Sequence, residues 1–206
     1  MRTPTIINII IIVLILWLIL TVWVQYAGGE KAAIVGNEDA AKRALIVYNP
    51  DPFYNLDEQV CKSFAEGLVG HGFTTKVATV KAAQNDTEDY DLYVFCANTY
   101  NWSPDWLIQR FIKKHPNLEV KNAVAITLGS GSTKRAKRLL ETALCNRDVV
   151  LLDSREYWLN RPNDENRMEE KNAKVVNDLA RQFGDEIGRY IEPKWLVEPD
   201  CSLTQL

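Results

Sequence analysis

The stretch from residue 6 to residue 24 constrains the fold of this chain more than any other feature. All of its residues except Asn8 and Thr21 are apolar, and none is charged. At about 1.5 Å of rise per residue, a helix of this length covers ~29 Å, which matches a hydrocarbon core of ~30 Å. The stretch therefore predicts one transmembrane helix that crosses a membrane once, after a short amino-terminal tail at residues 1–5.

The residues that flank this stretch favour an uncleaved membrane anchor. A cleavable signal peptide has a shorter apolar region, of about 7–15 residues, and a small-x-small cleavage site. Here the stretch is longer, and Trp23 and Tyr26 stand at its end, where interfacial aromatic residues occur. Cleavage near residues 27–29 is the alternative. A buried core helix is disfavoured, because the rest of the chain offers nothing to cover it on all sides.

Basic residues lie on both sides of the stretch and do not settle its orientation. Arg2 and the α-amino group precede it, whereas Lys31, Lys42 and Arg43 follow it. A short basic amino terminus before a lone apolar segment usually stays inside, so this terminus favours the non-cytoplasmic side for the rest of the chain. We therefore expect a single-pass membrane protein with its soluble domain on that side.

The remainder of the chain has the composition of one ordinary soluble domain. The whole chain carries 24 basic and 27 acidic side chains; without Arg2, which precedes the stretch, the ratio is 23 to 27, a net charge of −4. An acidic balance argues against a nucleic-acid partner. The apolar content of 47% and the six tryptophans argue against disorder. Cys, His, Asp and Glu form no cluster with ligand spacing, so no metal is expected.

Strand and helix patterns alternate through most of the soluble part. Residues 25–43 contain three glycines without sustained periodicity and are predicted to be a linker. The expected strands are residues 44–48, 73–80, 90–96, 120–128 and 149–153. Helices are expected to begin at Asn55, with Glu58 completing a capping box, at Ser103, with Pro104 in its first turn, at Ser132 or Thr133, and at Met168, the last one running to Ile191. This alternation predicts a parallel sheet covered on both faces.

Three loops then stand at the carboxyl edge of the sheet, where ligands bind in open α/β folds. They are residues 49–55 (NPDPFYN), 97–104 (ANTYNWSP) and 129–132 (GSGS). Tyr100 and Trp102 offer aromatic faces to a flat ligand, and Phe53 and Tyr54 do so if the first loop folds over the same edge. The alternative is that Trp102 and Trp106 only cover the end of the sheet.

With these loops, the sequence resembles a flavodoxin-like family. The resemblance covers residues 44–191 and rests on the ALIVY first strand, the YDLYVFCANTYNWSP segment, the AVAITLGSGS segment and the long final helix. It implies an α/β fold, a doubly wound five-stranded parallel sheet of order 2-1-3-4-5, followed by a carboxy-terminal tail at residues 192–206. It also implies that FMN is the cofactor. The cofactor-binding residues that it implies are Asn49, Asp51, Phe53, Tyr54, Asn55, Asn98, Thr99, Tyr100, Asn101, Trp102, Gly129, Ser130, Gly131 and Ser132.

The first loop departs from the family pattern, in which Ser/Thr-x-Thr-Gly-x-Thr surrounds the phosphate with hydroxyl and N–H groups. Pro50 and Pro52 lack the N–H donors. Asp51 adds a like charge, worth up to ~3 kcal/mol per unit of phosphate charge at ~5 Å and an effective dielectric of ~20. Asp57 and Glu58 already occupy the positive end of the helix dipole.

Two hypotheses about function follow. The first is a membrane-anchored flavodoxin-like protein that binds FMN and acts in electron transfer or quinone-type reduction with a redox partner protein. The alternative is a flavodoxin-fold module without a cofactor that serves as a membrane-tethered binding or scaffold domain. A reductase that uses a nicotinamide donor is a third reading, but no sequence feature supports it. No residue is predicted to be catalytic.

Overall fold

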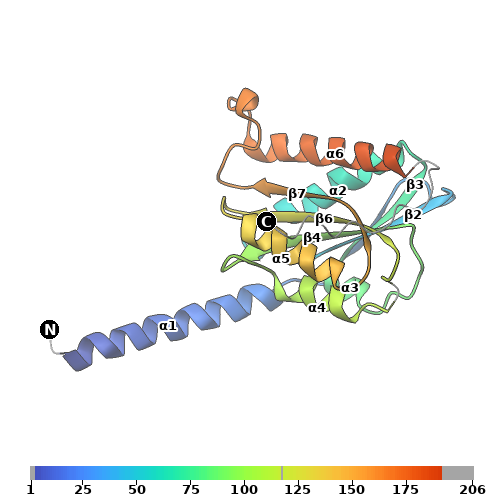
Figure 1. The fold of residues 1–206 in the computed structure, drawn as a ribbon. Coiled ribbons are helices and arrows are strands. Elements are labelled where there is room, and N and C mark those ends of the chain that lie inside the picture. Colours follow the sequence, from blue (N-terminus) through green and yellow to red (C-terminus); the bar gives the residue numbers. More distant parts are fainter. Residues whose placement is uncertain (1–2, 117, 192–206) are drawn as a thin grey trace.

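A seven-stranded sheet forms the centre of the structure, a computed structural model that describes residues 3–116 and 118–191 (Figure 1). The strands are β1 Ala32–Val35, β2 Lys42–Tyr48, β3 Phe73–Thr79, β4 Leu92–Tyr100, β5 Ser103–Pro104, β6 Asn122–Gly129 and β7 Val150–Trp158. Five of them pair in parallel, in the order β3-β2-β4-β6-β7. Numbered along the chain, this is the order 2-1-3-4-5, so the predicted doubly wound α/β fold is confirmed.

The prediction of five strands is wrong in number, because two short antiparallel strands extend the sheet. β1 pairs with β3, with Ala32 opposite Ala78, and lies inside the segment 25–43 that was expected to be a linker. Its four residues, AAIV, are too few to show a period in the sequence. β5 pairs with the end of β4 and forms a hairpin with it.

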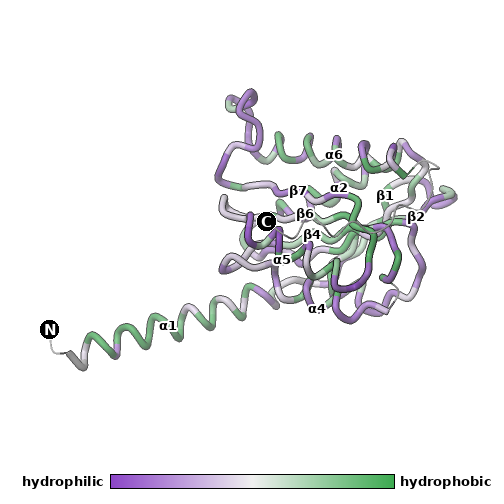
Figure 2. Tube along the Cα trace, in the orientation of Figure 1, coloured by the Kyte–Doolittle hydropathy of each residue, from purple (hydrophilic) through white to green (hydrophobic). Residues whose placement is uncertain are grey.

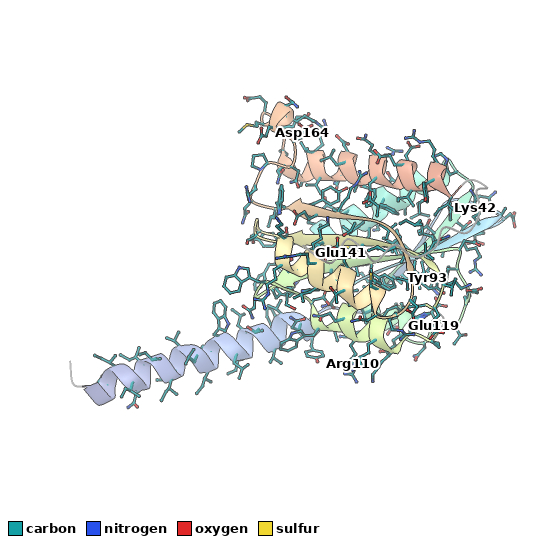
Figure 3. All side chains as sticks on the ribbon, viewed as in Figure 1. Lys42, Tyr93, Arg110, Glu119, Glu141 and Asp164 are labelled. Carbon is teal, nitrogen blue, oxygen red and sulfur yellow. The ribbon has the colours of Figure 1, made fainter. Side chains whose placement is uncertain are left out.

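The helices cover both faces of the sheet. They are α2 Leu56–Val69, α3 Val80–Ala83, α4 Trp106–Lys114, α5 Lys134–Cys145 and α6 Asn172–Tyr190, with a short 3-10 turn, η1, at Glu165–Arg167. Ile46 of β2 packs toward α2 and α6, whose Phe64 and Phe183 rings lie 5.2 Å apart. Its neighbour Leu45 packs in the opposite core with Tyr93, which lies fully buried inside the domain in Figure 3. Strand alternation thus supplies two cores, one on each face.

Several elements end at positions other than those expected. β4 runs to Tyr100 and β7 to Trp158, beyond the predicted ends at residues 96 and 153. The backbone ladder continues there after the apolar run has stopped, since Trp158 still pairs with Gly129 of β6. α6 begins at Asn172, and Met168 instead lies exposed just after η1.

The apolar amino-terminal segment forms α1, Thr3–Tyr26, which projects from the domain (Figure 1). Figure 2 shows that it is hydrophobic along its length, and its side chains from Ile6 to Leu20 are exposed. Within the described part of the chain, it is the one helix long and apolar enough to cross a membrane. Residues 3–5 of the expected tail belong to this helix. Residues 1–2 and the expected tail at 192–206 lie outside the described residues.

The carboxyl edge of the sheet faces the side from which α1 leaves the domain. In Figure 1, the arrowhead of β7 points toward this side. Asp164, which follows β7, and Lys42, which begins β2, lie at opposite ends of the domain in Figure 3. The fold therefore places the candidate site next to the base of the projecting helix.

Candidate functional site

The three loops singled out in the sequence meet at the carboxyl edge of the sheet. They border a cavity of about 200 Å³. Its lining residues are Asp51, Phe53, Tyr54, Leu56, Asp57, Asn98, Thr99, Tyr100, Leu128, Gly129, Ser130 and Leu159. Ligand pockets usually hold about 300–1,000 Å³, so this cavity is small for a whole nucleotide.

The Asp51 side chain closes the first loop on itself. Its Oδ1 accepts the backbone N–H groups of Phe53 at 2.7 Å and Tyr54 at 3.0 Å. Its Oδ2 accepts the hydroxyl of Tyr100 at 2.5 Å, from the end of β4. Burial and the Asp51 carboxylate both raise the pKa of Tyr100, so the phenol remains a donor. Asp51 thus fills the loop with a carboxylate and joins it to β4.

Asp57 forms a second buried carboxylate in the first turn of α2. It is 2% exposed and accepts the N–H of Asp51 at 2.6 Å, the N–H of Glu58 at 2.7 Å and the side-chain amide of Asn98 at 2.9 Å. Burial raises the pKa of Asp57 to about 6, against these hydrogen bonds, which favour the ionised form. The predicted capping box is not formed, because the Asn55 side chain caps no N–H of α2 and accepts instead from the Gln59 side chain.

Asp105 is the third carboxylate and caps the amino terminus of α4. Its Oδ1 accepts the N–H of Ile108 at 2.9 Å and its Oδ2 accepts the N–H of Asn98 at 3.2 Å. Asp105 is fully buried, and this burial raises its pKa to about 7. It replaces Ser103 as the helix cap: the prediction of a cap at Ser103 is wrong, because Ser103 and Pro104 pair in β5 instead.

The second loop is a tight hairpin rather than an open loop. Thr99 pairs with Pro104 and Tyr100 with Ser103, so Asn101 and Trp102 alone form the turn. Their φ angles are +51° and +60°, as a two-residue type I′ turn requires. The turn carries the Trp102 side chain away from the cavity, and this side chain is 60% exposed.

Arg161 covers the third loop. Its Nη1 donates to the carbonyl oxygen of Gly131 at 3.0 Å, and its guanidinium lies 5.1 Å from the centre of the Trp158 ring. Thr133, at the start of α5, donates to Glu156 at 2.6 Å and accepts from the Trp158 indole at 2.7 Å. The loop is therefore a strand-to-helix turn whose carbonyl oxygens at residues 129–131 accept from the segment that follows β7.

The structure brings together part of the predicted cofactor-binding set. The members that line the cavity are Asp51, Phe53, Tyr54, Asn98, Thr99, Tyr100, Gly129 and Ser130. The members that do not line it are Asn49, Asn55, Asn101, Trp102, Gly131 and Ser132. Asn49 is buried beneath the loop, where its amide donates to the carbonyl oxygen of Gln25 in α1. Cofactor binding by these residues stays a prediction.

Sequence reasoning missed three polar residues at this edge. Asp57 was assigned only to the helix dipole, and Asp105 was placed inside a helix that begins at Ser103. The Pro104-Asp105 pair carried a usable signal, because Asp is a preferred cap and a helix often begins just after it. Gln25, 1% exposed, accepts the N–H of Trp106 at 2.7 Å, and nothing in the sequence signals that contact.

The first loop does not fit an FMN phosphate. A phosphate loop binds its anion with free N–H groups at a helix amino terminus. Here the N–H groups of Asp51, Phe53 and Tyr54 donate to carboxylates of the same region. Pro50 and Pro52 have no N–H to offer. The Asp51 carboxylate holds the position of an anion in this loop, and a phosphate dianion would meet its charge.

Comparison with known structures identifies the fold. A flavodoxin from the domain Archaea superposes with a TM-score of 0.57 at 11% identity, covering 73% of this chain and 99% of that one. A flavodoxin, WrbA-like protein from Agrobacterium tumefaciens gives 0.54 at 14% identity, covering 73% and 97%. The NADH:FMN oxidoreductase EMOB, in its apo form, gives 0.52 at 13% identity, covering 71% and 90%. No protein-family model and no curated protein sequence matches the chain.

The chain therefore has a flavodoxin-like fold, the type found in these flavodoxins and in the NADH:FMN oxidoreductase. The resemblance seen in the sequence is confirmed at the level of the fold. At identities of 11–14%, the likeness does not carry a ligand from those proteins to this one.

Replacing Tyr100 by Phe is expected to loosen the first loop. The change removes the hydroxyl that donates to Asp51, and hydrogen bonds to charged groups contribute about 1.5–3 kcal/mol. We expect the free energy of unfolding to fall by ~2 kcal/mol, measured by denaturant titration of the full chain in mild detergent. Tyr54→Phe is the control, because the Tyr54 hydroxyl bonds to none of the residues that the structure describes. Equal losses of unfolding free energy in both variants would show that the bond between Tyr100 and Asp51 does not stabilise the loop.

Proposed function

We propose that this protein is a membrane-anchored flavodoxin-fold module that works as a tethered binding or scaffold domain and not as an FMN carrier. The observation that supports this role is the closure of the first loop by the Asp51 and Asp57 carboxylates. They use the N–H groups that a phosphate would need, so the loop is complete without a ligand. Function then rests on the surfaces that the fold presents and on its position at a membrane.

The anchor in this proposal is α1. Its length, its apolar composition and its exposed side chains support a single membrane crossing. Gln25 and Asn49 bond the end of this helix to the domain, so the anchor holds the domain close to the bilayer. The basic amino terminus favours the non-cytoplasmic side for the domain.

FMN binding with electron transfer or quinone-type reduction is the second candidate. The convergence of Phe53, Tyr54 and Tyr100 on one cavity at the carboxyl edge favours it. In that case the flavin supplies the redox chemistry, and the protein contributes stacking faces and orientation toward a redox partner protein.

Flavin titration of the full chain in mild detergent distinguishes the two candidates. We expect the native chain, after incubation with FMN and gel filtration, to retain no absorbance near ~450 nm and to show no thermal shift. A variant whose residues 50–55 are replaced by a Ser-x-Thr-Gly-x-Thr sequence regains N–H donors and loses the Asp51 charge, and we expect it to bind more FMN. Asp51→Ser alone is the matched control for charge.

Retention of FMN by the native chain at the level of the loop variant overturns the cofactor-free role and establishes the second candidate. Absence of the band in the native chain, with a gain in the loop variant, supports the first. If the loop variant fails to fold, the titration of the native chain alone distinguishes the two candidates, by whether that chain retains FMN.

A further inference from the structure

Large aromatic side chains surround the base of α1 and are exposed to solvent. They come from the end of α1, the first loop, the β4–β5 hairpin and the start of α4. The set consists of Trp23 (49% exposed), Tyr26 (46%), Phe53 (60%), Tyr54 (55%), Trp102 (60%) and Trp106 (41%). We call it the aromatic collar. Monomeric soluble proteins rarely expose so many large apolar side chains in one region, so the collar is expected to bind a partner.

Contacts to α1 bring the collar around the helix. The Trp23 and Phe53 rings lie edge to face with centroids 5.7 Å apart. The Asn101 side chain donates to the Thr21 hydroxyl at 3.4 Å, and the N–H of Trp106 donates to Gln25. Three separate segments of the domain therefore touch the same short part of α1.

These contacts also fix the level of the collar along the helix. Thr21 lies five residues before Tyr26, which at 1.5 Å per residue corresponds to ~7 Å along the axis, and it belongs to the apolar stretch 6–24. The tip of the β4–β5 hairpin therefore lies alongside the last turn of the apolar stretch. Trp102 sits at that tip with a φ of +60°, a conformation that is costly for a bulky residue. Because its neighbour Asn101 contacts Thr21, this exposed residue belongs to the part of the domain that lies at the level of the membrane helix.

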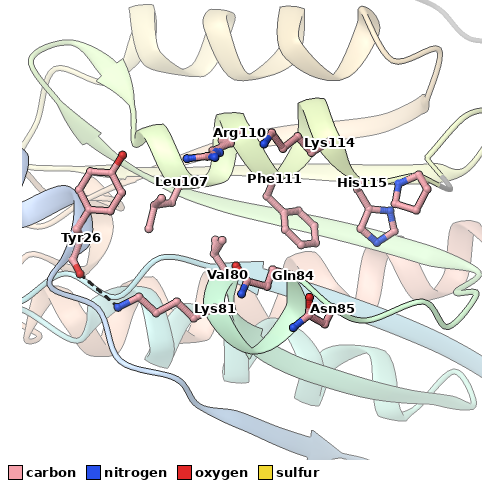
Figure 4. Close-up of a pocket in the computed structure, with 11 residues that line it drawn as sticks. Tyr26, Val80, Lys81, Gln84, Asn85, Leu107, Arg110, Phe111, Lys114 and His115 are labelled. Atoms are coloured by element: carbon pink, nitrogen blue, oxygen red, sulfur yellow. Dashed lines mark hydrogen bonds between the residues drawn. The ribbon is translucent and has the colours of Figure 1, made fainter.

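A cationic cleft adjoins the collar at Tyr26, which belongs to both (Figure 4). It has a volume of about 450 Å³ between α3 and α4, with Tyr26 at one end. Lys81 on one rim donates to the carbonyl oxygens of Tyr26 and Gly28. Arg110 and Lys114 stand on the α4 rim, exposed and without an ion pair to any described residue. The cleft therefore offers unpaired positive charge at the base of the membrane helix.

We infer that the aromatic collar and the cationic cleft together form a surface that docks on a bilayer with anionic headgroups. Tryptophan and tyrosine are enriched at the membrane–water interface, and Lys and Arg near it are attracted by anionic lipids. Continuity with α1 selects the bilayer over a soluble protein as the occupant. The inference rests on the proposed membrane anchor. It also assigns Phe53, Tyr54 and Trp102, which resemble flavin-contacting residues, to lipid.

Label depth in vesicles tests this docking surface. In the full chain with Cys145 and Cys201 replaced by serine, a cysteine at Trp102 or Tyr54 receives an environment-sensitive fluorophore; Cys61 and Cys96 are buried and remain. A label at Val69, which is exposed at the far end of α2, is the matched control. The vesicles contain phosphatidylcholine alone or with about 30% phosphatidylglycerol, and some lipids carry a nitroxide near the head of the acyl chain.

We expect the labels at positions 102 and 54 to be quenched at least about threefold more than the label at 69, since interfacial side chains reach the headgroup–acyl boundary. We also expect quenching to weaken in neutral vesicles and in the Arg110→Gln/Lys114→Gln variant. Equal quenching at all three positions overturns the docking surface, and equal quenching in both vesicle types overturns its anionic preference.

Flotation with vesicles after an alkaline wash tests the anchor separately. A chain that does not float disproves the anchor, whereas a floating chain with unquenched labels disproves docking alone.

Discussion

The free energy of unfolding of the full chain is expected to fall by about 3 kcal/mol as the pH rises from 5 to 8. Two carboxyl groups at the candidate site cause this trend. Burial raises the pKa of Asp57 to about 6 and that of Asp105 to about 7. Both are almost completely shielded from solvent, so the folded chain bears the cost of ionising them.

The direction follows from comparing the folded with the unfolded chain. In the unfolded chain an Asp carboxyl has a pKa of about 3.9 and is ionised throughout this range. The folded chain retains the proton on Asp57 and Asp105 at pH 5, which favours folding, and this advantage is lost as the pH rises through 6 and 7. His115 acts in the opposite direction, because burial lowers its pKa and its stabilising effect is lost as the pH falls. The two carboxyl groups outweigh this single imidazole.

Denaturant titrations at several pH values in mild detergent measure the trend. Asp105→Asn removes one ionisable group while keeping a good helix cap, so the slope of stability against pH is expected to flatten. Asp39→Asn, in the exposed segment between β1 and β2, is the matched control and is expected to keep the native slope. A native slope in Asp105→Asn, or a stability that rises from pH 5 to pH 8, would show that Asp105 is ionised without penalty.

The central fold was predictable because its strands are buried on both faces. The run Ala44–Tyr48 forms most of β2, which has parallel partners on both sides, and such strands read as continuous apolar segments. The apolar stripe through Val176, Phe183 and Ile187 likewise predicted α6. Strand order followed from the family resemblance, not from any property of the individual strands.

The chemistry of the site was less predictable, because it depends on contacts between distant parts of the chain. The Tyr100 hydroxyl meets Asp51 across 49 positions, and the Asn98 amide meets Asp57 across 41. In the sequence, Asp57 looks like any acidic residue in a first helical turn. Only the packing of β4 against the start of α2 excludes water from it and changes its titration. The departure of the phosphate loop was visible in Pro50, Asp51 and Pro52, but the self-closure by carboxylates was not.

Substitution of Gly184 by Ala is expected to destabilise the protein by ~3 kcal/mol or more. α2 and α6 pack with their backbones in contact at this position: a Cβ on Gly184 would stand 2.1 Å from the carbonyl oxygen of Phe64. A Cβ on Gly67, in the facing helix, would stand 2.1 Å from the carbonyl oxygen of Arg181. Backbone atoms cannot yield as a flexible side chain can, so the two helices must separate and open the core around Phe64 and Phe183.

Two further variants separate this helix contact from a general effect of replacing glycine. Gly70→Ala, at the end of α2, adds a Cβ that meets nothing within 4 Å, and it is expected to leave stability unchanged or to raise it by up to about 1 kcal/mol. The double variant Gly67→Ala/Gly184→Ala is expected to lose less than the sum of the single losses, because the helices separate only once. Strict additivity in denaturant titrations would mean that the two glycines act at independent contacts.

Separation of the two helices is also expected to weaken the closure of the first loop, because Asp57 lies at the other end of α2. The N–H protons of Phe53 and Tyr54 would then exchange faster with solvent.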